Sequence, residues 1–351
     1  MADSSNRFLI VRLGALGDVV HAIPVAAALR RAFPTARIDW LVSVRHREIL
    51  DLVPVIDRRL VISDRPAGGS GPSTGMLDTI RQLRRTTYDV ALDLQGLLKS
   101  AVLARGSGAA RVVGFSSRYL RERFARLFYT DIHDPGGGGM YHPADKTHVV
   151  WTNLGLLEPL GVRVATPEFP IEHVESTVAR QIAERTESRY ALLNAGAAWP
   201  NKRWPPSRLA KVARALREGH GLWSVALWGP GEEALAAEVA DESGGAAIMS
   251  PRTSIADIVA LARGAAVVVS GDTGPTHIAA AVGAPIVGLY GPTRPSRNGP
   301  WAPDDVTVSR DAICQCHHLR RCTLKRMCLL DIEVDEVVNA IDRRLAGVDR
   351  V

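Results

Sequence analysis

The sequence has few aromatic residues, few cysteines and no long apolar run. Nothing in it approaches the roughly 18 consecutive apolar residues of a membrane-spanning helix, which argues against an integral membrane protein. Hydrophobic residues make up 46% of the 351 residues and charged residues 23%, as in ordinary globular proteins. A chain of this length predicts two domains, each with its own core.

The N-terminus also lacks the basic start and the apolar core of a secretory signal peptide, so we expect a cytoplasmic protein. The formal net charge is +6, but the lysines and arginines form no dense run, which makes nucleic acid a poor candidate partner. An anionic substrate, or the anionic inner face of a membrane, explains the positive balance equally well.

Two glycine turns, at 13–18 and 269–277, are the most informative segments. Each follows a short apolar run, contains a lone aspartate and leads into an alanine-rich helical pattern. Unpaired amides at such a helix start bind phosphate or carboxylate groups well. One turn in each half predicts a cleft enzyme, in which one half holds a phosphorylated donor and the other supplies an acidic group.

Short apolar runs alternate with helical patterns along the whole chain, which predicts parallel α/β sheets. We expect strands at 8–13, 38–42, 60–62, 89–94, 111–115, 190–194, 223–228, 265–270 and 285–289. We expect helices at 18–33, from 97 onward, and at 145–160, 206–219, 232–242, 275–282 and 333–345. Segments 68–75 and 136–139 are predicted loops, and 161–170 is the predicted linker.

Six segments, in this order and spacing, resemble one enzyme family. They are 12–24, 93–100, 201–204, 228–232, 270–277 and 290–293. The chain resembles the ADP-heptose:lipopolysaccharide heptosyltransferases of glycosyltransferase family 9. The segment Gln95-Gly-Leu-Leu-Lys-Ser100 looks most like heptosyltransferase I, the type that adds the first heptose to Kdo.

The resemblance implies a GT-B fold, with two Rossmann-like, doubly wound parallel-sheet domains facing a cleft. Residues 1–162 would bind the acceptor, and residues 170–351 would bind the nucleotide sugar and end in a closing helix. It implies inverting transfer of heptose from ADP-heptose to a Kdo-containing inner-core acceptor of lipopolysaccharide. No metal would be needed for the chemistry, and the enzyme would work in the cytoplasm, with peripheral association at the inner-membrane face.

Within this family, Asp18 resembles the general base that takes the proton of the attacking sugar hydroxyl. An aspartate before Val-Val-His also suits a helix cap, and this alternative stays open. His21 lies one turn further on and is a candidate acceptor contact, although histidines on helix faces are more often simply packed.

The second glycine turn would hold the donor. The diphosphate would lie over the amides around Thr273, Gly274 and Thr276, with a threonine hydroxyl as a further donor. Asp272 would bind sugar hydroxyls or orient the loop, and His277 would face the phosphate or the sugar ring. The alternative is an ordinary helix cap by Asp272 or Thr273.

Two more residues are candidates on the donor side. Lys202 resembles a family lysine that neutralises the charge growing on departing ADP. By itself, however, Asn-Lys-Arg more often forms a solvated loop. Glu232 follows Gly-Pro-Gly at a strand end, where a carboxylate can accept bonds from ribose hydroxyls or contribute to a helix cap.

On the acceptor side, Lys99 resembles a family lysine. With Arg118, Arg121 and Arg123 it would form a basic floor for Kdo carboxylates or lipid phosphates. The stretch 118–126 would equally suit an exposed helix face. Acceptor choice would rest on loops such as 64–75 and 116–140, whose composition does not identify a substrate.

All four cysteines, Cys314, Cys316, Cys322 and Cys328, fall in one short segment with two histidines inside it. Clustering of this kind predicts a structural zinc or iron site, although the spacing is not the usual paired form. Four reduced thiols in a packed loop are the alternative. A catalytic role is not expected.

Two other functions compete with heptose transfer. One is a related transferase that uses another nucleotide sugar or a protein acceptor. The other is a non-catalytic protein that binds sugar nucleotides. The joint presence of Asp18, Lys202 and Asp272 argues against a pure binder, because binding alone needs no base opposite the donor.

Overall fold

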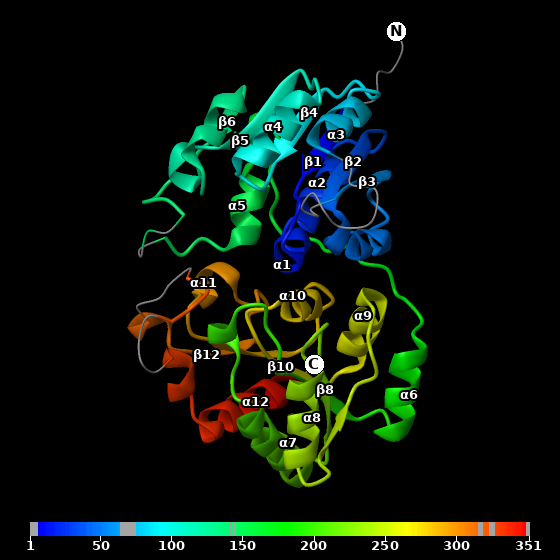
Figure 1. The fold of residues 1–351 in the computed structure, drawn as a ribbon, viewed down its shortest axis with the longest axis vertical. Helices are drawn as coiled ribbons and strands as arrows, with labels where there is room; N and C mark the ends of the chain where they lie inside the picture. Colours follow the sequence, from blue (N-terminus) through cyan, green and yellow to red (C-terminus); the bar gives the residue numbers. More distant parts are fainter. Residues whose placement is uncertain are drawn as a thin grey trace. The chain divides into compact units, whose positions relative to one another are not determined.

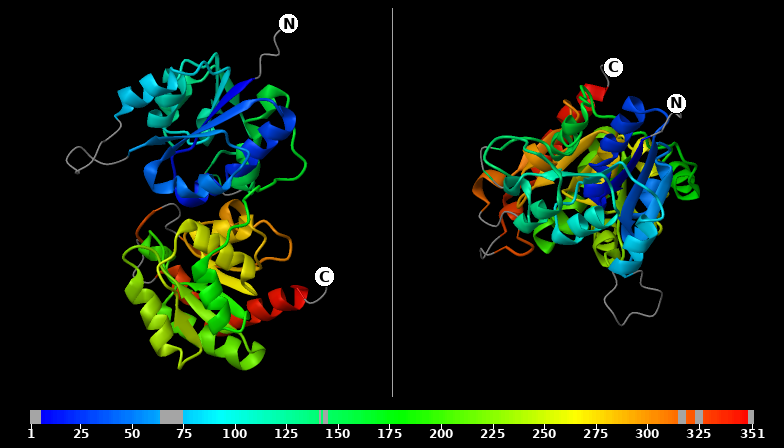
Figure 2. Two further views of the ribbon diagram at one scale, coloured as in Figure 1. Left: turned by 90° about the vertical axis from the view of Figure 1, so that its right-hand side faces the viewer. Right: turned by 90° about the horizontal axis from the view of Figure 1, so that it is seen from above.

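A computed structural model describes residues 6–63, 75–140, 142, 145–314, 319–322 and 327–348. The chain divides into two units, Met1–Glu172 and His173–Val351. Each unit contains one parallel sheet of six strands with helices on both sides of it (Figures 1 and 2).

The sheet of the first unit has the order β3-β2-β1-β4-β5-β6. Its strands are β1 (Arg7–Val11), β2 (Arg37–Ser43), β3 (Arg58–Ile62), β4 (Val90–Asp93), β5 (Arg111–Phe115) and β6 (Asp131–His133). Its helices are α1 (Leu16–Val20), α2 (Ile23–Ala32), α3 (Met76–Leu83), α4 (Leu98–Gly106) and α5 (Val149–Gly155). Short 3₁₀ helices include η3 (Ser117–Tyr119), η4 (Arg123–Phe128) and η5 (Glu158–Leu160).

The second unit repeats the plan, with the order β12-β11-β10-β7-β8-β9. Its strands are β7 (Tyr190–Asn194), β8 (Trp223–Leu227), β9 (Ala247–Met249), β10 (Val267–Gly271), β11 (Ile286–Tyr290) and β12 (Val306–Ser309). Its helices are α6 (Thr177–Arg185), α7 (Pro206–His220), α8 (Glu233–Glu242), α9 (Ile255–Gly264), α10 (Gly274–Ala281), α11 (Pro295–Asn298) and α12 (Val334–Val348). Counted within its own unit, this sheet has the same strand order as the first. Both sheets are doubly wound and Rossmann-like.

Alternation along the buried strands separates two apolar layers in the second unit. Ala191 and Leu193 of β7 belong to the core shared with α7, α8 and α12. Tyr190 and Leu192 belong to the core shared with α6, α9 and α10. Successive side chains of a strand point to opposite faces, so strands buried on both faces read as continuous apolar runs.

Two predicted helices differ in the structure. The helix predicted over 18–33 is two helices, because Pro24 in the first turn of α2 has no N–H to continue the first one. The helix predicted over 145–160 is limited to α5 and η5, with His148 as its N-cap residue accepting a hydrogen bond from the Val150 amide. The predicted loop at 68–75 lies almost entirely outside the described residues.

Candidate functional site

Asp18 stands at the carboxyl edge of the first sheet, where the loop after β1 leads into α1. The side chain of Asp18 is 38% exposed, and its Oδ2 lies 2.8 Å from Nη2 of Arg12. The Ala15 amide donates to the same oxygen at 3.1 Å. Asp18 therefore supports the start of α1 and still presents a carboxylate to solvent, so capping and catalysis do not exclude each other.

The loop that carries Asp18 is tied to the neighbouring strand β4. Oε1 of Gln95, just beyond β4, accepts hydrogen bonds from the Leu13 amide at 3.0 Å and the Gly14 amide at 3.4 Å. A guanidinium N–H of Arg12 donates to the Leu94 carbonyl. Gly14 has no room for a side chain, because an added Cβ would lie 2.5 Å from the ring of His46. These contacts hold the Asp18 carboxylate in a defined place.

His21 lies in the interior of the first unit, with only 1% of its surface exposed. Its ring packs edge-on against His148, with ring centres 5.5 Å apart. The Asn153 side chain donates to the His21 carbonyl at 3.1 Å. The predicted acceptor contact stays a prediction, and this packing supports the alternative role of His21 in the core.

The basic residues predicted for the acceptor follow β4 and β5 at the same sheet edge. Lys99 is half-buried on α4, and Arg121 is exposed just before η4. Arg118 is also exposed but lies 2.7 Å from Asp134, so part of its charge is already balanced. The stretch 118–126 is not one continuous helix, because η3 ends at Tyr119 and η4 begins at Arg123. The alternative of an exposed helix face stays open for the arginines of η4.

The second candidate site is a buried cluster at the carboxyl edge of the second sheet. Asp272 follows β10, and its Oδ2 lies 2.6 Å from Nζ of Lys202. Its Oδ1 lies 2.9 Å from Nε2 of His277, one turn into α10. All three side chains are at least 85% buried, with exposed fractions of 5% for Asp272, 15% for Lys202 and 6% for His277.

This cluster corrects the idea that Lys202 lies in a solvated loop. Lys202 ends the 3₁₀ turn η6 (Pro200–Lys202), and its ammonium also lies 4.5 Å from the ring centre of Trp199. Burial by itself raises the pKa of the Asp272 carboxyl. The hydrogen bond from His277 and the charge of Lys202 outweigh it and hold that pKa far below its usual range. Asp272 is therefore an anion matched by a cation.

Hydroxyl groups line the turn between β10 and α10. The Asn194 side chain donates to the hydroxyls of Ser270 and Thr273, both at 3.0 Å. The Thr276 hydroxyl donates back to the Gly271 carbonyl at 2.5 Å and lies 3.0 Å from the Thr273 hydroxyl. Thr273 is the N-cap residue of α10 but makes no side-chain capping bond. The start of α10, where Gly274 is the first residue, therefore keeps amides that Thr273 does not cap.

Glu232 is the N-cap residue of α8, and its side chain makes no capping bond within that helix. Its carboxylate turns back toward the sheet edge instead. One oxygen accepts from the Gly229 amide at 3.2 Å, and the other lies 3.3 Å from Arg203. A Cβ at Gly196, in the turn after β7, would lie 1.9 Å from this carboxylate, so glycine there makes room for Glu232. The side-chain cap expected as the alternative is absent.

Three of the four cysteines lie in the described part of the chain, and none of these three forms a disulfide. Cys314 and Cys328 are buried, and the half-buried Cys322 packs against them. Cys316 lies outside the described residues. Within the described residues, no group of three or more histidine, cysteine or acidic side chains could hold a metal ion. The metal site predicted at the four cysteines is therefore unsupported among the described residues.

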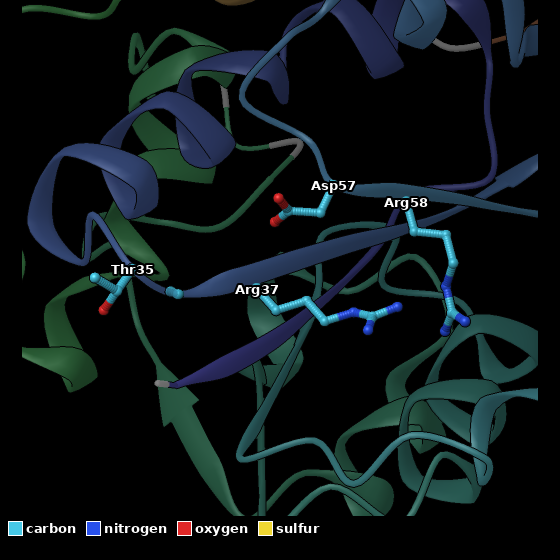
Figure 3. A pocket seen from close by; sticks show the side chains of 5 residues that line it. Thr35, Arg37, Asp57 and Arg58 are labelled. Carbon is cyan, nitrogen blue, oxygen red and sulfur yellow. The ribbon is translucent and has the colours of Figure 1, made fainter. Parts of the chain in front are cut away.

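A separate pocket in the first unit lies at the amino ends of β2 and β3, the edge opposite Asp18 (Figure 3). Arg37 and Arg58 extend from it toward the same side. Both pair with the buried Asp39, at 3.0 and 2.9 Å, and Tyr88 donates to the same carboxylate at 2.7 Å. This network links the ends of neighbouring strands, so we assign it a structural role.

Four residues of these two sites were not predicted as functional: Arg12, Gln95, Trp199 and Asn194. Arg12 and Gln95 nevertheless lie inside two of the segments that carry the family resemblance. Their motifs were the available signal. The contacts of Asn194 with Ser270 and Thr273 arise only when β7 and β10 pair in the fold, whereas Trp199 contacts Lys202 three residues further along the chain.

Comparison with known proteins agrees with this architecture. Residues 76–328, more than half of the chain, match the profile of glycosyltransferase family 9 (heptosyltransferase). Lipopolysaccharide heptosyltransferase 1 of Pseudomonas aeruginosa is 30% identical, over 90% of this chain and 87% of its own length. Among the described residues, no helix combines the length and apolar character needed to cross a membrane.

Solved structures show the same fold. A glycosyltransferase of family 9 from Veillonella parvula superposes with a TM-score of 0.79 and 21% identity, covering 99% of both chains. Heptosyltransferase WaaC of Escherichia coli, solved with ADP, superposes with a TM-score of 0.76 and 24% identity, covering 96% of this chain and 99% of its own. WaaC has also been solved with ADP-2-deoxy-2-fluoro heptose. The predicted GT-B fold is confirmed, and the chain is a glycosyltransferase that belongs to family 9, the heptosyltransferases.

Proposed function

We propose that this protein transfers heptose from ADP-heptose to a Kdo-containing inner-core acceptor of lipopolysaccharide, with inversion at the anomeric carbon. The names of its relatives support this activity. The observation that carries it here is the Lys202–Asp272–His277 cluster beside the start of α10. A buried lysine held at 2.6 Å by an aspartate, next to helix amides that lack a Thr273 cap, suits a diphosphate.

The donor would lie against the second unit. Its diphosphate would take hydrogen bonds from the amides around Gly274 and from the hydroxyl of Thr273. The hydroxyl of Thr276 is buried and already donates to the Gly271 carbonyl, so Thr276 would support the turn from behind. Asp272 would keep Lys202 and His277 in place, because its two oxygens are already engaged by them. Glu232 would accept bonds from the ribose hydroxyls. This gives residues 170–351 the donor role.

The acceptor would lie against the first unit, residues 1–162. A sugar hydroxyl attacks the anomeric carbon of the donor, the bond from that carbon to the diphosphate oxygen breaks, and the hydroxyl proton passes to Asp18. ADP leaves as an anion whose added charge Lys202 balances, so the departing phosphate needs no proton. Lys99, Arg118 and Arg121 would hold the anionic groups of the acceptor. The buried His21 would pack beneath the acceptor site.

This scheme uses no metal ion and no cofactor. The described cysteines take no part in it, and elemental analysis of the purified protein decides whether the full segment, Cys316 included, carries zinc or iron. We place the reaction in the cytoplasm at the inner face of the inner membrane, because that is where a lipid-linked acceptor and a soluble nucleotide sugar meet.

The test follows ADP release from ADP-heptose in the presence of a Kdo-containing lipid acceptor, with UDP- and GDP-sugars as matched controls. We expect acceptor-dependent ADP release, and thermal stabilisation by ADP-sugars above that by the other two classes. Transfer from a different nucleotide sugar, or to a protein but not to the glycolipid, would replace this proposal with the competing transferase. Stabilisation without any turnover would make the protein a binder.

A further inference from the structure

Two large apolar side chains project into solvent from the first unit. Phe124 is 75% exposed and Leu127 is 74% exposed, the two highest values among the large apolar side chains of the described residues. Both belong to η4, which packs against α4. Residues this apolar and this exposed on one short helix indicate a contact surface.

The apolar and the basic residues of η4 lie on different faces of the helix. A 3₁₀ helix has three residues per turn, so residues three apart share a face. The resulting stripes are Phe124 with Leu127, Arg123 with Arg126, and Ala125 with Phe128. Ala125 is fully buried and Phe128 is half-buried, which makes the third stripe the one that packs on the unit. The exposed faces of η4 are therefore one apolar stripe beside one basic stripe.

The arginines of this surface are available for an external anion. Arg121, Arg123 and Arg126 are all exposed, and within the described part of the chain their side chains make no ion pair or hydrogen bond. The one acid among them, Glu122, accepts a hydrogen bond from the Leu98 amide at 2.7 Å. That leaves uncompensated positive charge next to exposed apolar groups.

We infer that Phe124 and Leu127, flanked by Arg123 and Arg126, are a docking surface for an anionic lipid membrane. The apolar pair would enter the interfacial layer while the guanidinium groups stay among the phosphates. A second copy of this chain is a poor occupant, because it would bring the same arginines and the same positive net charge of +6 to the contact.

The position of this surface fits a lipid-linked substrate, a point that rests on the proposed function. Glu122 ties the start of η4 to the start of α4. Three residues before α4, Gln95 holds the loop that carries Asp18. The start of η4 and the loop that carries the proposed base are thus both tied to the chain around the start of α4, so an acceptor anchored in the bilayer would present its sugar on the side of Asp18.

Vesicle cosedimentation tests the surface without any assumption about activity. The probes are vesicles of phosphatidylcholine alone and vesicles with one quarter phosphatidylglycerol. We expect the wild-type protein to bind the anionic vesicles, and Phe124→Ser/Leu127→Ser to lower the partition coefficient at least about ten-fold, as loss of two buried apolar side chains implies. Arg123→Gln/Arg126→Gln should weaken binding to anionic vesicles several-fold and flatten its salt dependence.

A matched control removes exposed apolar groups elsewhere on the same unit. Leu77 of α3 is 69% exposed and Met76 is 39% exposed, so Met76→Ser/Leu77→Ser should bind vesicles like the wild type. Wild-type protein that ignores anionic vesicles, or a Phe124/Leu127 variant that binds them normally, would overturn the inference. It would also be overturned by concentration-dependent self-association in light scattering that the Phe124/Leu127 variant abolishes, because that result makes the surface an interface between copies.

Turnover separates this inference from the proposed function. Phe124→Ser/Leu127→Ser should lose turnover on a vesicle-embedded acceptor and keep it on a deacylated, water-soluble one. Turnover with neither acceptor, combined with intact vesicle binding by the wild type, contradicts the proposed function and leaves the docking surface standing. Equal turnover of variant and wild type on the embedded acceptor counts against docking alone.

Discussion

Asp93 and Asp272 occupy corresponding places in the two units. Each lies at the carboxyl end of the fourth strand of its own sheet, β4 in one unit and β10 in the other, and both carboxylates are buried. Their partners differ. Among the described residues, the donors to Asp93 are all neutral and include the Tyr129 hydroxyl at 2.8 Å and the Ser100 hydroxyl at 3.0 Å, whereas Asp272 accepts from Lys202.

The difference in partners reverses the direction of the pKa shift. Burial raises the pKa of Asp93, and its hydrogen bonds from Tyr129, Gln95 and Gly96 only reduce that rise. His277 and Lys202 overcome the same effect at Asp272 and lower its pKa. The same fold therefore uses a buried acid at a strand end in two ways. In the first unit the carboxyl is a hydrogen-bonded structural group, and in the second it is an ionised carboxylate that pairs with a lysine. Both of these acids are buried, whereas the side chain of Asp18 is 38% exposed and open to a proton donor from outside.

The largest expected effect is therefore on Asp18. Asp18→Asn keeps the size of the side chain and removes the proton acceptor, so we expect turnover to fall roughly 10²–10⁴-fold. Donor binding and thermal stability should change little. Steady-state ADP release and a thermal melt measure the two quantities. Near-normal turnover in a folded variant would leave Asp18 with a structural role only.

The second largest effect is expected from substitution of Lys202, the buried cation of the second unit. Lys202→Met leaves Asp272 buried without its main counter-charge, and we expect a loss of about 3–5 kcal/mol of unfolding free energy in denaturant titrations, together with weak use of the donor. The double variant Lys202→Met/Asp272→Asn removes both charges. It should recover most of the stability and none of the donor use. If the double variant recovers donor use, Lys202 does not act on the diphosphate.

Because the pKa shifts of Asp272 and Asp93 have opposite signs, the two carboxyls should contribute to the free energy of unfolding with opposite pH dependences. The lowered pKa of Asp272 stabilises the fold above about pH 4, the usual range of a carboxyl, and this contribution is lost as the pH falls through the native pKa. The raised pKa of Asp93 favours the fold at low pH, and this contribution is lost as the pH rises through the native pKa.

Urea titrations of Asp93→Asn and Asp272→Asn between pH 3 and pH 7 measure this contrast. The free-energy advantage of the wild type over Asp272→Asn should grow as the pH rises from about 3 to 5. The free-energy advantage of the wild type over Asp93→Asn should instead shrink as the pH rises toward neutral. Parallel curves for the two variants would contradict the contrast between the two carboxylates.

Much of the secondary structure of the two units could be predicted from the sequence. The glycine turns after 13 and 270 and most of the buried strands were predicted, because continuous apolar runs between helices are typical of parallel sheets. The edge strands β6, β9 and β12 were missed because each has only three or four residues, and β6 and β12 also contain polar residues. The break before α2 shows that a periodic pattern does not reveal where a proline interrupts it.

The site was predicted residue by residue only where a motif supplied the signal. Asp272 and Lys202 were both named, but their pairing was not, because 70 residues separate them and only the fold brings η6 to the end of β10. The burial of Lys202 and His21 followed from the same long-range packing. Local sequence favoured an exposed loop for the lysine, and tertiary contacts decided otherwise.

The smallest expected effect concerns Glu232, the second acid at the carboxyl edge of the second sheet. Its side chain is 16% exposed and is held by Arg203 at 3.3 Å, a looser arrangement than that of Asp272. Glu232→Gln keeps the shape and weakens acceptance of ribose hydroxyl bonds, so we expect KM for the ADP-sugar to rise about three- to ten-fold, the weight of one hydrogen bond, with kcat nearly unchanged.

Arg203→Gln provides the matched control for this prediction, because it removes the partner of Glu232 and leaves the carboxylate in place. If Glu232 binds ribose directly, Arg203→Gln should raise KM less than Glu232→Gln does. Equal increases from both variants would mean that the pair acts only by shaping the turn that Gly196 and Gly229 leave open for it. A fall in kcat with KM unchanged would remove Glu232 from donor binding and connect it to the reacting centre.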